Sequence, residues 1–483
     1  MFSNFINEHW IYHDGIEDIC LVKEIRFMEV KYENVKLPEC DCTNVPVQLT
    51  DETMQDRLNK VLDRMNRENF DSLVIYADLE HGNNFEYLTG FLPRFEEALL
   101  VLNSNGNHYM VLGNENLNKA SKARIKNTSI HCPHFSLPNQ PMDVKEGIKD
   151  ILKRCEFKSG DKVGIVGWKN FTSKYEDNAQ LFDVPYYVVD TIKELVGSNV
   201  FNATRLFIGE DGARCTNNVN EIVHYEFGAA LASDCILKAM NHLDVGVSEM
   251  EVGNILNAYG QRNSVVTIAA SGPRFIKANI YPTTNTVKLK DPISLSIGYK
   301  GGFSSRAGYA VHDSNELDET VQDYLDVLVK PYFSSVAVWL EKVHCGMLGG
   351  EVYDLIEETM PKTEYNWSLC PGHLTADEEW MSSNIYENSK ELVQSGMLYQ
   401  IDIIPSKSGY AGTSAESTVL LADENLRKQI AQEEPELWNR IQKRRKYIIN
   451  ELNISLNDDV LPMCSTVAYL RPFLLNKEKA MKL

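Results

Sequence analysis

The second half of the chain presents the same order of elements twice, with two helices followed by strands in each copy. The apolar side chains of residues 221–243 recur at helical intervals, and a Gly-Val-Ser turn precedes the second helix. The predicted elements, in order, are helices at 221–243 and 249–259, strands at 265–270 and 291–311, helices at 320–346 and 351–360, and strands from residue 366 onward. This order indicates a duplicated topology, although the two copies share no residue-level repeat.

The first half of the chain alternates helices and strands instead. The pattern predicts helices at 52–70 and 143–155, and strands at 71–77, on both sides of the Asn105-Gly106 hairpin turn, at 162–167 and at 184–190. Such alternation is typical of an α/β domain with a mixed sheet. We therefore predict an α/β (α+β) protein with an arm over residues 1–50, a first domain over 51–205 and a second domain over 206–483. The short alternating segments of the arm suit a strand pair or an irregular arm laid on the first domain.

Composition narrows the classes of function. A net charge of -20 argues against binding to nucleic acid or to an anionic membrane, because both are held by clustered Lys and Arg. No apolar run is long enough to cross a bilayer, and the acidic, polar start differs from a secretory signal. We therefore expect a cytoplasmic protein, in which the ten cysteines are free thiols.

Three side chains that can bind a metal lie between residues 370 and 416. His373 follows a Pro-Gly turn, Asp402 lies inside the apolar run QIDIIP, and Glu416 precedes the apolar run STVLL. A carboxylate between apolar neighbours needs a partner when it is buried. Cys370 could be a nucleophile activated by His373, although a buried, unreactive thiol is the more common role for such a residue.

Several segments together resemble the creatinase and Xaa-Pro aminopeptidase family. They are FEYLTGFLPRFEEALLVLN in the first domain, and EIVHYEFGAALASDCI, GVSEMEVGNIL, IAASGP, the turn before His373, SGMLYQIDIIP and AESTVLL in the second. They occur in family order between residues 52 and 423. The resemblance implies a creatinase-like α/β domain followed by a pita-bread domain, and it implies a homodimer.

The resemblance also implies a site in which two divalent metals are bound by two Asp, one His and two Glu. By position, His373 and Glu416 match this pattern, and Asp402 is a shortened form of the first Glu. Ser296 and Arg306 stand where the family has its two Asp. Asn279 stands where creatinase and the peptidases have a further histidine.

These substitutions predict that two metals are not bound. A dinuclear site needs bridging carboxylates, and Ser296 and Arg306 remove two negative charges and add a positive one. The Arg306 guanidinium could take the place of the cations by binding Asp402 and Glu416 directly.

Three hypotheses for function follow. The first is a metal-independent hydrolase of a small C–N-bonded substrate, with His373 as general acid or base and with Asp402, Glu416, Arg306, Asn279 and Ser296 binding a small polar molecule. The second is an Xaa-Pro aminopeptidase or dipeptidase with a single Mn or Zn ion on His373, Asp402 and Glu416. The third is a non-catalytic pita-bread module that binds a peptide or a protein partner.

Overall fold

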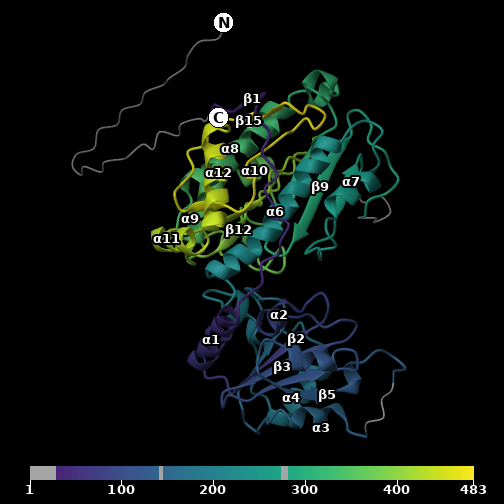
Figure 1. Ribbon diagram of the computed structural model, residues 1–483, viewed down its shortest axis with the longest axis vertical. Helices are drawn as coiled ribbons and strands as arrows, with labels where there is room; N and C mark the ends of the chain where they lie inside the picture. The colour runs from purple at the N-terminus through teal and green to yellow at the C-terminus, as the bar shows by residue number, and fades with distance from the viewer. Residues whose placement is uncertain (1–28, 141–144, 274–280) are drawn as a thin grey trace, which may run out of the picture.

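The computed structural model describes residues 29–140, 145–273 and 281–483. Figure 1 shows two bodies joined end to end, the first built from the purple and blue part of the chain and the second from the teal, green and yellow part. α6 points from the second body toward the first. One continuous apolar core includes Met65 and Leu73 of the first body as well as Ile222 and Ile236 of α6. The bodies therefore pack together without a solvent layer between their cores.

A six-stranded mixed sheet forms the first body, in the order β5-β4-β3-β2-β6-β7. β2/β3 and β3/β4 are antiparallel, whereas β2/β6, β6/β7 and β4/β5 are parallel. Its elements are α1 (Asp51–Arg67), β2 (Ser72–Ala77), α2 (Asn83–Thr89), β3 (Ala98–Asn103), β4 (His108–Leu112), β5 (Thr128–His131), α3 (Ile148–Lys153), β6 (Val163–Val166), α4 (Tyr186–Val196), β7 (Val200–Asn202) and α5 (Arg205–Ile208). The predicted strands at 71–77 and 162–167 and the hairpin at Asn105-Gly106 are confirmed, and Gly106 has the positive φ of 86° that such a turn requires.

The strand predicted at 184–190 is wrong, because these residues begin helix α4. The run of Val and Tyr side chains favours a strand by local propensity. In the structure Val188, Ile192 and Val196 lie on one stripe of a helix and pack on the sheet, in an apolar cluster with Ile151 of α3. Burial of one helical face therefore overrides the local preference.

The second body contains the predicted double succession of helices and strands. Its elements are α6 (Val219–His242), α7 (Glu249–Leu256), β8 (Ile268–Ser271), β9 (Pro292–Tyr299), β10 (Gly302–Tyr309), a π-helix (Leu325–Val329), α8 (Lys330–Lys342), α9 (Gly349–Thr359), α10 (Lys362–Tyr365), β11 (His373–Leu374), β12 (Leu398–Gln400), β13 (Thr418–Leu421), α11 (Glu424–Glu433), α12 (Pro435–Asn450), β14 (Val460–Pro462) and β15 (Lys479–Lys482). Apart from β15, the strands form two antiparallel sheets, β10-β9-β8 and β11-β12-β13-β14.

α6 is the central helix of the second body. A capping box between Asn218 and Glu221 begins it, and most of its length is buried. At Gly228 the helix touches the β9–β10 turn so closely that an added Cβ would lie 1.7 Å from the carbonyl oxygen of Lys300. Across the described ranges, neither α6 nor any other helix combines the length and hydropathy needed to span a membrane.

Residues 29–50 of the arm pack mainly on the second body rather than on the first, so the predicted placement is wrong for this part. Residues 1–28 lie outside the described residues. Strand β1 (Lys31–Asn34) of the arm pairs with β15, and Figure 1 shows both strands at the end of the second body that lies far from the first. Asp41 receives two hydrogen bonds from Arg444 of α12, at 2.7 and 3.0 Å. These long-range pairings have no local sequence signal.

Candidate functional site

The register of one sheet brings His373, Asp402 and Glu416 together. His373 of β11 pairs with Gln400 of β12, and Gln400 pairs in turn with Thr418 of β13. Asp402 lies two residues after Gln400, and Glu416 lies two residues before Thr418. Because side chains two residues apart share a face, all three point to the same side of the sheet.

Three carboxylates surround one nitrogen of the His373 ring. Nε2 lies 3.2 Å from Glu379 Oε1, 3.7 Å from Asp402 Oδ2 and 4.0 Å from Glu416 Oε1. The other nitrogen, Nδ1, lies 3.3 Å from the carbonyl oxygen of Leu374 and therefore donates its hydrogen there. In a neutral imidazole Nε2 would then carry a lone pair that faces negative oxygens. We call these four residues the His373 cluster.

Glu379 is the member of the His373 cluster that the sequence analysis missed. It belongs to the acidic loop, residues 375–380, which leaves β11 and turns back toward it. Its side chain is 20% exposed, whereas His373 is fully buried. An acidic run close behind a candidate histidine is the signal that could have pointed to it, but the same run is typical of a solvent-exposed loop.

Trp380, the last residue of the acidic loop, covers one face of the His373 ring. The two rings are stacked with their centroids 4.0 Å apart and their planes at 22°. Trp380 itself remains 39% exposed. The stack fixes the orientation of the imidazole and separates that face of the ring from solvent.

The His373 cluster holds more negative charge than its surroundings neutralise. Burial raises the pKa of Asp402 to about 6, against the opposing effect of His373 and together with the charge of Glu379. Burial and the charges of Asp402 and Glu379 also hold the pKa of Glu416 well above its ordinary value. Burial alone would lower the pKa of His373, but Glu379 and Asp402 raise it. Asp402 Oδ1, Glu416 Oε1 and His373 Nε2 are buried without a hydrogen-bond partner.

Arg306 does not neutralise this charge in the way the sequence suggested. Its guanidinium donates to Glu416 through the backbone carbonyl oxygen, at 2.8 Å, and not through the carboxylate. The other donors bind Ser417 Oγ and the carbonyl oxygens of Ser305, Thr466 and Tyr469. All five N–H groups are thus used by the protein, and the residue is 1% exposed. The predicted role of Arg306 in binding a substrate is therefore not supported by its contacts.

The register of the β9–β10 hairpin explains the difference. Ser305 lies opposite Ser296, and their hydroxyl oxygens are 3.0 Å apart, whereas Arg306 lies opposite Leu295. Arg306 therefore points to the other face of the hairpin. The pair that shares a face is Ser296 and Ser305, and neither is an acid. Asn279 lies outside the described residues.

The donor set of the His373 cluster fits one divalent cation. One ligand atom from each of His373, Glu379 and Glu416 can be chosen so that the three lie within 4.8 Å of one another. Ligands at about 2.0–2.2 Å from one zinc ion lie roughly 3.4 Å apart in a tetrahedron. The separations of 3.2 and 4.0 Å from His373 to the two glutamates are close to this value. One imidazole and carboxylate oxygens also form a donor set that zinc and manganese accept.

Cys370 is expected to react slowly with alkylating reagents. Burial raises the pKa of its thiol to about 11, and Sγ lies 3.0 Å from the carbonyl oxygen of Gly372. The thiol form therefore dominates at pH 7.5 and is a poor nucleophile. Mass spectrometry after iodoacetamide treatment of the native protein should find Cys370 unmodified while the exposed Cys40 is labelled. Equal labelling of both would contradict this prediction.

Comparisons with known proteins agree with this architecture. Residues 57–182 match the family model of the creatinase/prolidase N-terminal domain. Similar solved structures include dipeptidase PepE from Mycobacterium ulcerans (15% identity, TM-score 0.60, covering 78% of this chain and 95% of that one) and a prolidase from Thermococcus sibiricus (18%, 0.59, 78% and 96%). An Xaa-Pro dipeptidase from Bacillus anthracis is similar too (14%, 0.57, 77% and 96%). No curated protein sequence matches the chain significantly. The predicted resemblance and the predicted two-domain pita-bread fold are confirmed.

Proposed function

Because the chain has a creatinase/prolidase N-terminal domain and the two-domain fold of the prolidases and aminopeptidases P, we propose that it is a peptidase-like hydrolase that works with a single divalent cation. His373, Glu379 and Glu416 would hold the cation, with Asp402 beside them. The observation that carries this proposal is the uncompensated charge of the His373 cluster, in which three carboxylates lie within 4.0 Å of His373 Nε2. Buried oxygens of Asp402 and Glu416 have no hydrogen-bond partner.

Two sources of positive charge could neutralise the three carboxylates. Protons would do so by keeping Asp402 and Glu416 in their acid forms, which the raised pKa of each makes easier. A divalent cation would do so while also giving His373 Nε2 a partner for its lone pair. A proton on His373, whose pKa Glu379 and Asp402 raise, would also give Nε2 a partner in Glu379. Protons must then be taken up at several groups, whereas one cation would serve all four side chains, so we favour the cation.

The residues of the cluster would have distinct roles. A bound cation polarises a substrate carbonyl group and makes a water molecule more acidic. Asp402, which lies beside the cation site, could take a proton from an attacking water and pass it to the leaving amine. Trp380 and the Leu374 carbonyl oxygen would hold the His373 ring in place. The substrate class that this chemistry suits is a peptide or small amide with a C–N bond.

A second cation is not part of the proposal. Two ions held in one site need carboxylates that bridge them. In the β9–β10 hairpin Ser296 lies opposite Ser305, and both side chains carry hydroxyl groups instead of carboxylates. Loss of the dinuclear centre is therefore proposed on the chemistry of these two side chains.

The metal-independent hydrolase receives less support from the geometry. A histidine that acts as general base must be unprotonated and must face the substrate. Nε2 of His373 faces carboxylates that raise its pKa, and Arg306 has no free donor for a substrate carboxylate. We therefore place this hypothesis second.

We expect the chelator-treated wild-type protein to bind about one equivalent of Mn²⁺ or Zn²⁺. Isothermal titration calorimetry at pH 7.5, with elemental analysis of the dialysed product, measures the stoichiometry. His373→Ala should abolish binding because it removes the one nitrogen ligand. His344→Ala is the matched control, since His344 is exposed and lies outside the cluster.

The same samples should be tested for turnover of Xaa-Pro dipeptides and of small amides, with and without the metal. Metal-dependent release of an amine by the wild type and not by His373→Ala is the expected result. Two equivalents of metal would contradict the single-ion site. Absence of both binding and turnover would overturn the proposal and favour the non-catalytic binding module.

A further inference from the structure

We propose that Arg214 is a positioning residue for the His373 cluster. It fixes the acidic loop (residues 375–380) to the first domain and thereby holds Glu379 against His373. The inference rests on the proposed function in one respect, that Glu379 is a ligand of the cation. Its structural part, the attachment of the loop, stands on contacts of its own.

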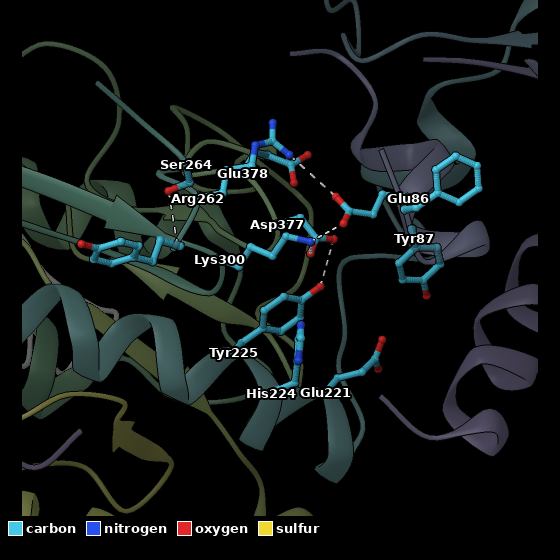
Figure 2. Close-up of polar contacts among 12 residues, drawn as sticks. Glu86, Tyr87, Glu221, His224, Tyr225, Arg262, Ser264, Lys300, Asp377 and Glu378 are labelled. Carbon is cyan, nitrogen blue, oxygen red and sulfur yellow. Dashed lines mark hydrogen bonds and ion pairs between the residues drawn. The ribbon is translucent and has the colours of Figure 1, made fainter. Parts of the chain in front are cut away.

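The acidic loop serves two places at once. Glu379 belongs to the His373 cluster, through the ion pair at 3.2 Å, and Trp380 covers the His373 ring, through the stack at 4.0 Å. Asp377 and Glu378, the two residues before them, point instead to the junction between the two domains (Figure 2). A shift of Asp377 and Glu378 would therefore also move Glu379 and Trp380.

Arg214 connects this loop to the first domain. Its Nη1 donates to Glu378 Oε1 at 2.8 Å and to Asn84 Oδ1 of α2 at 2.9 Å. Its Nη2 binds Glu378 Oε2 and lies 3.6 Å from Asp377 Oδ2. The side chain is 1% exposed, so these bonds form away from solvent, where a forked guanidinium is most effective.

A second set of contacts holds Asp377 at the junction. Figure 2 shows it between Lys300 and Tyr225, with Glu86 of α2 reaching toward the same lysine. Lys300 Nζ lies 3.5 Å from Asp377 and 2.5 Å from Glu86, and the Tyr225 hydroxyl donates to Asp377 at 3.2 Å. Arg214 and Lys300 thus face acids from both domains, Asp377 and Glu378 of the loop and Glu86 of α2.

Hydrogen bonds within the acidic loop make its backbone rigid, so a displacement of one residue also displaces its neighbours. Leu374 N donates to Ser382 O at 2.7 Å, and Met381 N donates back to Leu374 O at 2.9 Å, so the two ends of the loop are joined. Inside it, Thr375 Oγ1 donates to the carbonyl oxygen of Glu378 at 3.0 Å. Release of Glu378 would therefore displace Glu379, the next residue. Groups that orient metal ligands are commonly worth about 10- to 100-fold in metal affinity.

The test compares Arg214→Met with Arg57→Met in the full-length protein. Arg57 is a matched control because it is equally buried at the junction, where it pairs with Glu221 at 2.7 Å. It makes no direct hydrogen bond to the acidic loop and reaches it only through the Tyr225 hydroxyl, which donates to Asp377. Two readouts are needed. Hydrogen–deuterium exchange of peptides that cover residues 374–382 is measured without metal, and Mn²⁺ affinity is measured by calorimetry.

Arg214→Met is expected to speed exchange in residues 374–382 by about tenfold and to weaken Mn²⁺ binding by about 10- to 100-fold. Arg57→Met should leave both nearly unchanged. If Arg214→Met fails to fold, Arg214→Lys keeps the charge without the fork and should show the same changes to a smaller degree.

Unchanged exchange in the loop of either Arg214 variant would overturn the inference, whatever happens to metal binding. Equal changes in the Arg214 and Arg57 variants would also overturn it, because the effect would then come from general loosening of the junction. A wild-type protein that binds no metal would contradict the proposed function, and the exchange readout would still decide the role of Arg214.

Discussion

Replacement of Asp377 by alanine is expected to lower the free energy of unfolding by about 1.5–3 kcal/mol at pH 7. The carboxylate is buried, and it faces Lys300 at 3.5 Å and Arg214 at 3.6 Å. Its removal leaves Arg214 with Glu378 and Lys300 with Glu86, so the positive charge of the junction is then only partly compensated. Urea unfolding followed by tryptophan fluorescence measures the change.

The stabilisation that Asp377 contributes is expected to depend on pH. Burial would raise the pKa of Asp377, but Lys300 and Arg214 hold it well below its ordinary value. The stabilisation is therefore complete above the unfolded-state pKa of about 4 and is lost as the pH falls toward the folded-state value. The gap between wild type and variant should narrow in acid. Asp326→Ala, at an exposed i,i+4 pair, is the control and should change stability by less than about 1 kcal/mol.

Replacement of Asp402 by asparagine is expected to raise the free energy of unfolding of the metal-free protein. Because burial raises the pKa of Asp402 to about 6, its ionisation in the metal-free folded protein costs about 2–3 kcal/mol at pH 8. An uncharged amide of the same shape avoids that cost. The metal-free variant should therefore be more stable than the wild type above pH 6 and should lose this advantage near pH 4, where the folded and unfolded states both keep the proton.

Unfolding in EDTA at pH 4 and at pH 8 separates this effect from changes in packing, which would appear at both pH values. Addition of saturating Mn²⁺ should then reverse the order, because the ion stabilises the wild type more than the variant. A variant less stable than the wild type at pH 8 in EDTA would show that the charge of Asp402 is compensated in the folded protein, contrary to the electrostatics described above.

Together these two changes would distinguish two acidic groups that lie close together. At the domain junction, cations match the acids, so loss of an acid is harmful. In the metal-free His373 cluster, carboxylates outnumber cationic groups, so removal of one carboxylate reduces the electrostatic repulsion and raises the free energy of unfolding. A bound metal would reverse this effect. A local arrangement of charges that destabilises a fold commonly marks a functional site.

The sequence predicted those parts of the fold whose signals are local. The strand at 71–77 and the Asn105-Gly106 hairpin follow from short-range patterns, and the structure contains both. The helix at Tyr186–Val196 was missed because its β-branched and aromatic residues prefer strands until the sheet offers a surface for one face. The position of the arm depends on contacts with residues far away in the chain, which a local pattern does not contain.

The candidate site was predicted in part, for a related reason. His373, Asp402 and Glu416 were identified from their order along the chain, and strand register brings them together. Glu379 was missed because its place depends on a loop that folds back. Arg306 does not bind the carboxylates of the cluster, because a difference of one residue in a hairpin moves a side chain to the opposite face of the sheet.

The pairing of β1 with β15 has a consequence for how the protein is made. β1 leaves the ribosome before the strands of both bodies, but its partner strand β15 is synthesised after all of them. The first sheet, over residues 72–202, can form as soon as it emerges, whereas the arm has no strand to join until residues 479–482 have been synthesised. During that interval β1 presents an open edge, and its Lys31 and Glu33 are the kind of charged side chains that discourage pairing with the wrong chain.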